Sequence, residues 1–203
     1  VSSQSQAVIT ASAHDFANTP GAWALGPENL ATPPLAQQLQ MCVACHTPHN
    51  GNTALGVPLW NHEISGVVFT MYGSAAGPSF QAVEAAQPAG VSLACLSCHD
   101  DTTNIDAYGQ AIGAGTGTIS GFFPGTTAAF GPDMTNDHPI SITYDAALDL
   151  ADGELWDPTL DPSGLGGTIQ QDLLFGALGD QVECASCHDV HNTTVDPLSG
   201  YLL

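Results

Sequence analysis

CVACHTPHN at residues 42–50 and CASCHDVHN at residues 184–192 are two copies of one pattern, and CLSCHDD at residues 95–101 shares its first half. Each copy contains Cys-x-x-Cys-His, so all six cysteines fall into three pairs, each followed directly by a histidine. This spacing is the attachment signature of c-type haem, in which the adjacent histidine is an axial ligand of the iron. The pattern therefore predicts three covalently bound haem c groups, each containing iron.

The residues expected to hold these groups follow directly from the pattern. The thioether positions are Cys42, Cys45, Cys95, Cys98, Cys184 and Cys187. The first iron ligands are His46, His99 and His188. A zinc ribbon would use four thiolates and leave the third pair without a role. A thioredoxin-like pair would not recur three times before a histidine, and a disulfide framework gives no reason for the histidines.

The opposite iron ligands must come from the five remaining histidines. His49 and His191 each follow a motif histidine by three residues, so each can reach a neighbouring haem but not the far side of its own. His138 follows Asp137 and His14 precedes Asp15, and such a carboxylate can orient an imidazole.

There are more candidate histidines than there are irons that need a second ligand. His62, after Trp60 and Asn61, is expected to be structural. Four candidates remain for three irons: His14, His49, His138 and His191. The sequence leaves open which histidine serves which haem, and whether His14 serves a haem of an adjacent subunit. Met41, Met71 and Met134 are expected to be packing residues, so every iron would have two histidine ligands. No open iron position is required, and the chain is not expected to be an enzyme.

The charge balance restricts the partners of the protein. The chain has 20 acidic residues, no Lys or Arg, and a formal charge of −20. Nothing can neutralise nucleic-acid phosphates or an anionic lipid surface, whereas a positively charged docking partner is compatible. Haem propionates would need N–H groups, hydroxyls or bound cations. Ca²⁺ or a similar cation is expected at acidic clusters, at Asp100 and Asp101 or at Asp157 and Asp161.

The expected fold is mostly irregular coil with a few short α-helices and minimal β structure, wrapped around three stacked c-type haems. Its 22 glycines and 14 prolines favour turns, and large flat cofactors would fill a core that has few aliphatic residues. A single domain is expected over 1–203, with an extended N-terminal arm over 1–34. The expected local elements are a strand at 6–11, helices at 35–41, 80–87 and 170–178, and a surface loop or weak strands at 112–130.

No stretch of the sequence has the ~20 consecutive apolar residues of a membrane span. The sequence starts at Val1 without a basic, apolar leader. This start is typical of an exported protein after signal removal, so an extracellular or cell-surface location is expected.

Taken in order along the chain, several segments resemble the multihaem cytochromes with doubled C-x-x-C-H motifs. These segments are HDF at 14–16, CVACHTPHN at 42–50, PLWNH at 58–62, CLSCHD at 95–100, TNDHPISITY at 135–144 and QVECASCHDVHN at 181–192. The resemblance implies export, bis-histidine iron and little regular secondary structure. It assigns the distal ligands to His14, His49, His138 and His191. The missing basic residues depart from the family and put its docking partners in question.

The CHTPH and CHDVH elements are also similar to those of extracellular cytochromes that polymerise into conductive filaments. This likeness implies extracellular electron transfer by the repeating subunit of a homopolymer. The alternative is a discrete periplasmic or extracellular electron carrier, or a subunit of a surface redox complex. Redox proteins or extracellular acceptors would be its partners.

Overall fold

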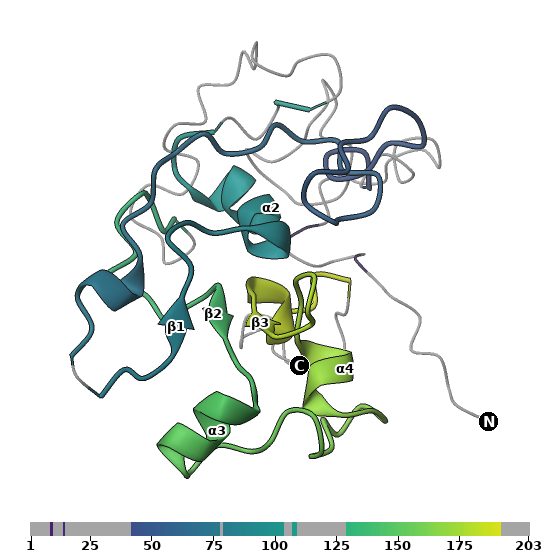
Figure 1. Cartoon of the computed structure of the whole chain (residues 1–203). Coiled ribbons are helices and arrows are strands. Elements are labelled where there is room, and N and C mark those ends of the chain that lie inside the picture. Colours follow the sequence, from purple (N-terminus) through teal and green to yellow (C-terminus); the bar gives the residue numbers. More distant parts are fainter. Residues whose placement is uncertain are drawn as a thin grey trace.

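The structure is a computed structural model that describes Ile9, His14 and residues 42–77, 79–103, 107–108 and 129–191. Most of this part is coil and turn, with a few short helices and one small sheet (Figure 1). The expected irregular fold with minimal β structure is therefore confirmed. The elements in chain order are η2 Tyr72–Ser74, β1 Val83–Glu84, α2 Gly90–His99, β2 Ile142–Thr143, α3 Ala146–Asp152, α4 Ile169–Leu173, β3 Gln181–Val182 and η4 Cys184–Ser186.

The sheet has the strand order β1-β2-β3, and both strand pairs are antiparallel. Ile142 lies in the middle, opposite Glu84 on one side and Val182 on the other. Backbone bonds extend the pairing, because Ser141 N–H donates to the Val182 carbonyl at 2.7 Å. The sheet thus joins the segment that follows His138 to the segment that leads into Cys184.

Helix α2 is the central element and contains the second cysteine motif. It follows Pro88, and Gly90 at its start has φ of +51°, a conformation that glycine adopts without steric cost. Its buried residues point to more than one side of the helix: Ser92, Ala94, Leu96 and Ser97. Ser97 Oγ donates to the Leu93 carbonyl and accepts the Ser65 N–H. The helix is therefore enclosed by chain around much of its circumference.

Two small apolar clusters pack against α2. Leu96 belongs to the first, which contains Phe69, Met71, Leu96, Met134 and Ile140. Ala94 packs in the second with Leu55 and Trp60. Met71 and Met134 are thus buried packing residues, as the sequence predicted, while Met41 lies outside the described residues.

Helices α3 and α4 begin with clear capping residues. Asp145 Oδ1 accepts the N–H groups of Ala147 and Leu148 at the start of α3. At α4, Thr168 and Gln171 form a reciprocal capping box. Neither helix contains a buried residue. Capping and turn bonds, rather than apolar burial, therefore define this part of the chain.

The expected helix at 80–87 is wrong. Val83 and Glu84 form strand β1, and the side chain of Gln87 bonds to both the N–H and the carbonyl of Phe69. Pairing with β2 overrides the helical propensity of the Ala- and Glu-containing run. The helix expected at 170–178 is shorter and ends at Leu173, while α2 and α3 were not predicted. The segments 1–8, 35–41 and 112–128 lie outside the described residues.

Within the described residues, no helix is both long enough and apolar enough to cross a membrane. This finding agrees with the absence of a long apolar run in the sequence.

Candidate haem-binding sites

All three cysteine motifs fold into compact turns. In the first motif, the His46 N–H donates to the Cys42 carbonyl at 2.8 Å, and in the third the His188 N–H donates to the Cys184 carbonyl at 3.0 Å. The second motif forms the C-terminal end of α2. Positions three and four residues apart are neighbours on one side of a helical turn. Each turn can therefore present two sulfurs and one imidazole on the same side.

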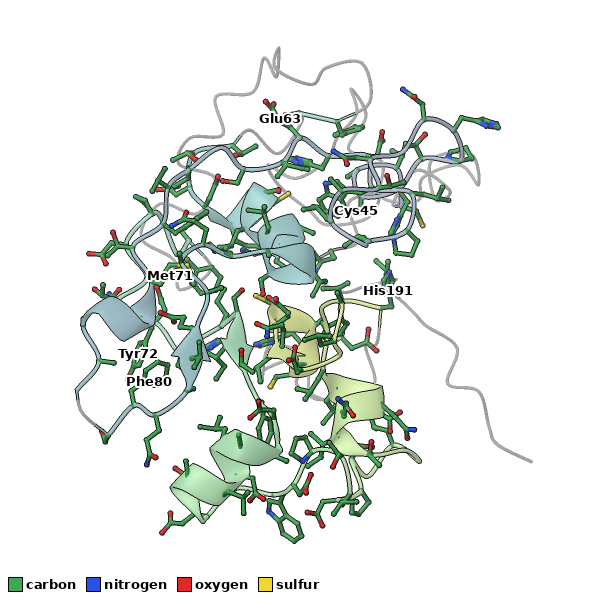
Figure 2. All side chains as sticks on the ribbon, viewed as in Figure 1. Cys45, Glu63, Met71, Tyr72, Phe80 and His191 are labelled. Atoms are coloured by element: carbon green, nitrogen blue, oxygen red, sulfur yellow. The ribbon has the colours of Figure 1, made fainter. Side chains whose placement is uncertain are left out.

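Each motif histidine faces a second histidine from a distant part of the chain. The ring centroids of His46 and His191 are 6.2 Å apart, with 23° between the ring planes. His188 and His138 are 6.4 Å apart at 22°. His99 and His14 are 6.1 Å apart at 57°. Figure 2 shows His191 beside the segment that carries Cys45.

These spacings match the dimensions of a metal held between two imidazoles. With metal–nitrogen bonds of about 2.0 Å, two rings on opposite sides of one metal have centroids about 6.3 Å apart. Every pair joins one motif histidine to a different non-motif histidine. The residues present therefore fit three iron centres with two histidine ligands each.

Contacts between Nδ1 and nearby oxygen atoms orient several of these imidazoles, as a hydrogen bond at His46 and as an ion-pair contact at His191. His46 Nδ1 lies 2.7 Å from the Pro58 carbonyl oxygen, and His191 Nδ1 lies 3.8 Å from Asp189 Oδ1. His138 Nδ1 makes a longer contact of 3.4 Å with the Pro139 carbonyl. A protonated Nδ1 that donates to an oxygen leaves Nε2 as the free lone pair, which is the usual arrangement for a metal ligand.

The two other histidines differ from these six. His62 is 2% exposed, its Nδ1 lies 2.9 Å from the Glu63 carbonyl, and its Nε2 lies 3.6 Å from Cys98 Sγ. It is buried among neighbours, as expected of a structural histidine. His49 is exposed, and it takes part in none of the three histidine pairs. His14, which the sequence allowed to reach an adjacent subunit, lies beside His99 of its own chain.

The three sites are close neighbours. The Cys95 thiol of the second motif hydrogen bonds to Cys184 of the third, and this bond and burial raise the pKa of Cys95. Burial, followed by electrostatic repulsion from the neighbouring His99 and His191, lowers the pKa of His14 from 6.5 to about 4. His14 is therefore neutral at pH 7, the form that binds a metal.

Buried polar contacts fix the second and third motifs against each other. The Cys184 N–H donates to Ser92 Oγ of α2 at 2.9 Å. Glu183, which is 4% exposed, accepts the Ser141 hydroxyl at 3.0 Å. Burial raises the pKa of Glu183, although hydrogen bonds from Ser92 and Ser141 oppose this effect. These hydrogen bonds connect α2, the sheet and η4 to one another.

Asp100 supports the second motif from the position directly after His99. It is fully buried and accepts four hydrogen bonds, from Ser65 Oγ, Thr102 N, Thr103 N and Thr103 Oγ1. Burial alone would raise its pKa, but the hydroxyl and backbone donors together hold the pKa below 3.8. A chain without Lys or Arg thus stabilises a buried carboxylate with neutral donors.

Trp60 provides a further observation that favours an additional group at the first motif. Its side chain is 6% exposed and packs with Leu55, Ala94 and the partly buried Cys45. The indole Nε1 is buried without a hydrogen-bond acceptor among the described residues. Such a donor is costly unless a partner is present. A carboxylate of a bound haem would supply an acceptor that the described residues do not.

The expected cation sites are not assembled in the described part of the chain, where no three His, Cys, Asp or Glu side chains gather as metal ligands. Asp157 Oδ1 instead accepts the N–H and the hydroxyl of Thr159, and Asp161 accepts the Asp157 N–H. A calcium ion at these positions therefore stays a prediction.

No protein-family model and no curated protein matches this chain. Sequence reasoning missed the roles of Ser92, Trp60 and Glu183, because their contacts depend on long-range packing. The signal for Trp60 was its place in PLWNH, between the first and second motifs.

Proposed function

We propose that this protein is an electron-transfer c-type cytochrome with three haems, each bound by one cysteine motif and two histidines. The observation that carries the proposal is the set of three histidine pairs at 6.1, 6.2 and 6.4 Å. His46 and His191 would hold the first iron, His99 and His14 the second, and His188 and His138 the third. The protein would wrap around the three groups, and each motif would attach its group through two thioethers.

The chain's own residues perform a positioning role in this proposal. A bound haem supplies the one-electron chemistry of its iron. Pro58 and Asp189 orient the ligand rings, and the Ser92–Cys184 bond holds two attachment turns together. If each pair of histidines holds one haem, none of the irons would be left open for a substrate. This arrangement supports electron transfer rather than catalysis.

The proposed location is extracellular, and two assembly states follow from the sequence. The three histidine pairs lie within one chain, so a carrier that works as a single chain would need no ligand from a neighbour. A filament is the second candidate, in which subunits would meet through their surfaces instead of through a shared histidine. Electron microscopy at working ionic strength separates the two: long ordered filaments support the second and monodisperse particles exclude it.

Carbon monoxide binding tests the ligand assignment. In the reduced, haem-loaded protein without substitutions, we expect no carbon monoxide adduct, because no iron would have an open position. His138→Ala should create one carbon-monoxide-binding haem in three, whereas the matched variant His49→Ala should create none. An adduct in the unmodified protein, or equal behaviour of both variants, would overturn the assignment of His138.

A further inference from the structure

The residues 145–180, here called the α3–α4 lobe, form the part of the molecule that lies away from α2 (Figure 1). The lobe contains six of the nine large apolar side chains that are exposed among the described residues. Their exposed fractions are Leu150 83%, Leu155 40%, Trp156 65%, Leu160 76%, Leu165 61% and Leu178 78%. Neither helix of the lobe buries a residue. Within the lobe only Pro158 and Leu174, both outside the two helices, are buried, so the lobe contributes little to the core of its own chain.

The backbone of the lobe is nevertheless well ordered by hydrogen bonds. The Tyr144 hydroxyl donates to the Trp156 carbonyl at 2.6 Å, and the Ile169 and Gln170 N–H groups donate to the carbonyls of Asp161 and Pro158. These bonds hold the apolar side chains on a defined support while leaving them in contact with solvent. Ordered, exposed apolar groups of this kind mark interaction surfaces.

The charges around these side chains identify the kind of partner. Eight of the chain's 20 acidic residues lie in the lobe: Asp145, Asp149, Asp152, Glu154, Asp157, Asp161, Asp172 and Asp180. Asp152, Glu154 and Asp172 are exposed. A second copy of this chain would bring another −20 and no basic side chain to the contact. Exposed apolar side chains that share one lobe with eight carboxylates instead complement a protein that presents Lys and Arg beside apolar side chains.

The lobe is also adjacent in the sequence to the proposed haem site of His138 and His188. It is the insertion between β2 and β3, and the strands lead to His138 on one side and to Cys184–His188 on the other. His138 therefore lies shortly before the lobe in the sequence and His188 shortly after it, and the two imidazoles form one of the three histidine pairs. We propose that the α3–α4 lobe docks a basic redox protein, so that electrons enter or leave through the haem held by His138 and His188. This inference rests on the proposed function.

The test uses the haem-loaded full chain and a small Lys-rich c-type cytochrome as the basic probe. Binding is measured by titration calorimetry at low and high salt, independently of electron transfer. The test variants are the apolar pair Leu150→Asn/Leu160→Asn and the acidic pair Asp152→Asn/Glu154→Gln. The matched control is Val68→Asn/Val83→Asn, which changes side chains that are 80% and 71% exposed outside the lobe.

We expect each lobe variant to raise the Kd about tenfold, as loss of a central contact does. The control should stay within about twofold, and high salt should weaken binding of the unmodified protein. Hydrogen exchange should show protection of residues 145–180 on binding. Equal effects of lobe and control variants, or a sedimenting dimer that the lobe variants dissociate, would overturn the basic-partner proposal. If the chain purified from a host that attaches haem c shows no haem absorbance, the proposed function is wrong. Binding of the basic probe through the lobe would then still support the docking surface.

Discussion

Replacing buried Asp100 with asparagine tests how this chain holds a charge without basic residues. Asp100 Oδ1 accepts the N–H groups of Thr102 and Thr103, and Oδ2 accepts the hydroxyls of Ser65 and Thr103. Asparagine keeps one acceptor oxygen but places an NH₂ group against the two hydroxyls. The hydroxyls can rotate to accept, so the four bonds become neutral bonds and none needs to be lost.

The expected cost follows from the difference between charged and neutral hydrogen bonds. Bonds to charged groups contribute about 1.5–3 kcal/mol and neutral bonds about 0.5–1.5 kcal/mol, so each conversion should cost about 1–1.5 kcal/mol and four of them about 4–6 kcal/mol in the free energy of unfolding. Guanidinium unfolding of the haem-loaded protein at pH 7, followed by circular dichroism, measures this difference. Because the pKa of Asp100 is lowered in the folded state, its contribution is complete above the unfolded pKa and is lost as the pH falls through the folded value.

The neighbouring Asp101→Asn variant is the matched control. Asp101 is exposed and has a φ of +57°, which asparagine tolerates well. Its expected effect is below about 0.5 kcal/mol. Equal unfolding free energies for the two variants would refute the idea that the Asp100 network stabilises the end of α2. A difference between Asp100→Asn and the parent that persisted below the folded pKa of Asp100 would refute the assignment of that difference to charge.

Three further predictions concern packing, charge and ligation. Leu96→Ala, at a side chain 1% exposed, should cost about 2–5 kcal/mol in unfolding free energy, whereas Leu150→Ala, at 83% exposed, should cost less than about 0.5 kcal/mol. Glu183→Gln should be at least as stable as the parent at pH 7. The pKa of Glu183 is raised above its ordinary value of 4.5 in the folded state. The protonated carboxyl therefore stabilises the fold below pH 4.5, and this stabilisation is lost as the pH rises through the pKa of the folded protein. A parent protein whose stability relative to Glu183→Gln increased from pH 4 to pH 7 would contradict this sign. Met71→Leu should change stability by less than about 1.5 kcal/mol and leave the haem spectrum unaltered, because Met71 packs among apolar residues; a changed spectrum would identify it as an iron ligand instead.

The features of the fold and of the candidate sites that can be predicted from the sequence depend on short, local patterns. The Cys-x-x-Cys-His spacing specifies a turn, and each motif folds as such a turn. The burial of Met71 and Met134 followed from the surplus of histidines. The irregular fold followed from the many glycines and prolines and the few aliphatic residues.

The missing parts depend on contacts between distant segments. Nothing near His14 indicates that it lies beside His99, and nothing near His46 indicates His191. The segment at 80–87 has helical composition, yet pairing with Ile142 and Thr143 makes it a strand. Helix α2 was missed because its buried Ser92 and Ser97 interrupt the apolar periodicity, and their hydroxyls are satisfied by residues far along the chain or one turn back.

The central claim is that the chain carries three covalent haems, and its most direct test is the intact mass of the purified protein. The protein should be produced in a host that attaches haem c, and its mass measured under denaturing conditions that keep thioethers intact. The expected mass is that of the 20.8 kDa chain plus three haem groups. Changing both cysteines of one motif to alanine, as in Cys95→Ala/Cys98→Ala, should remove one haem. A mass equal to that of the bare chain, or of the chain with zinc or with disulfides only, would contradict it.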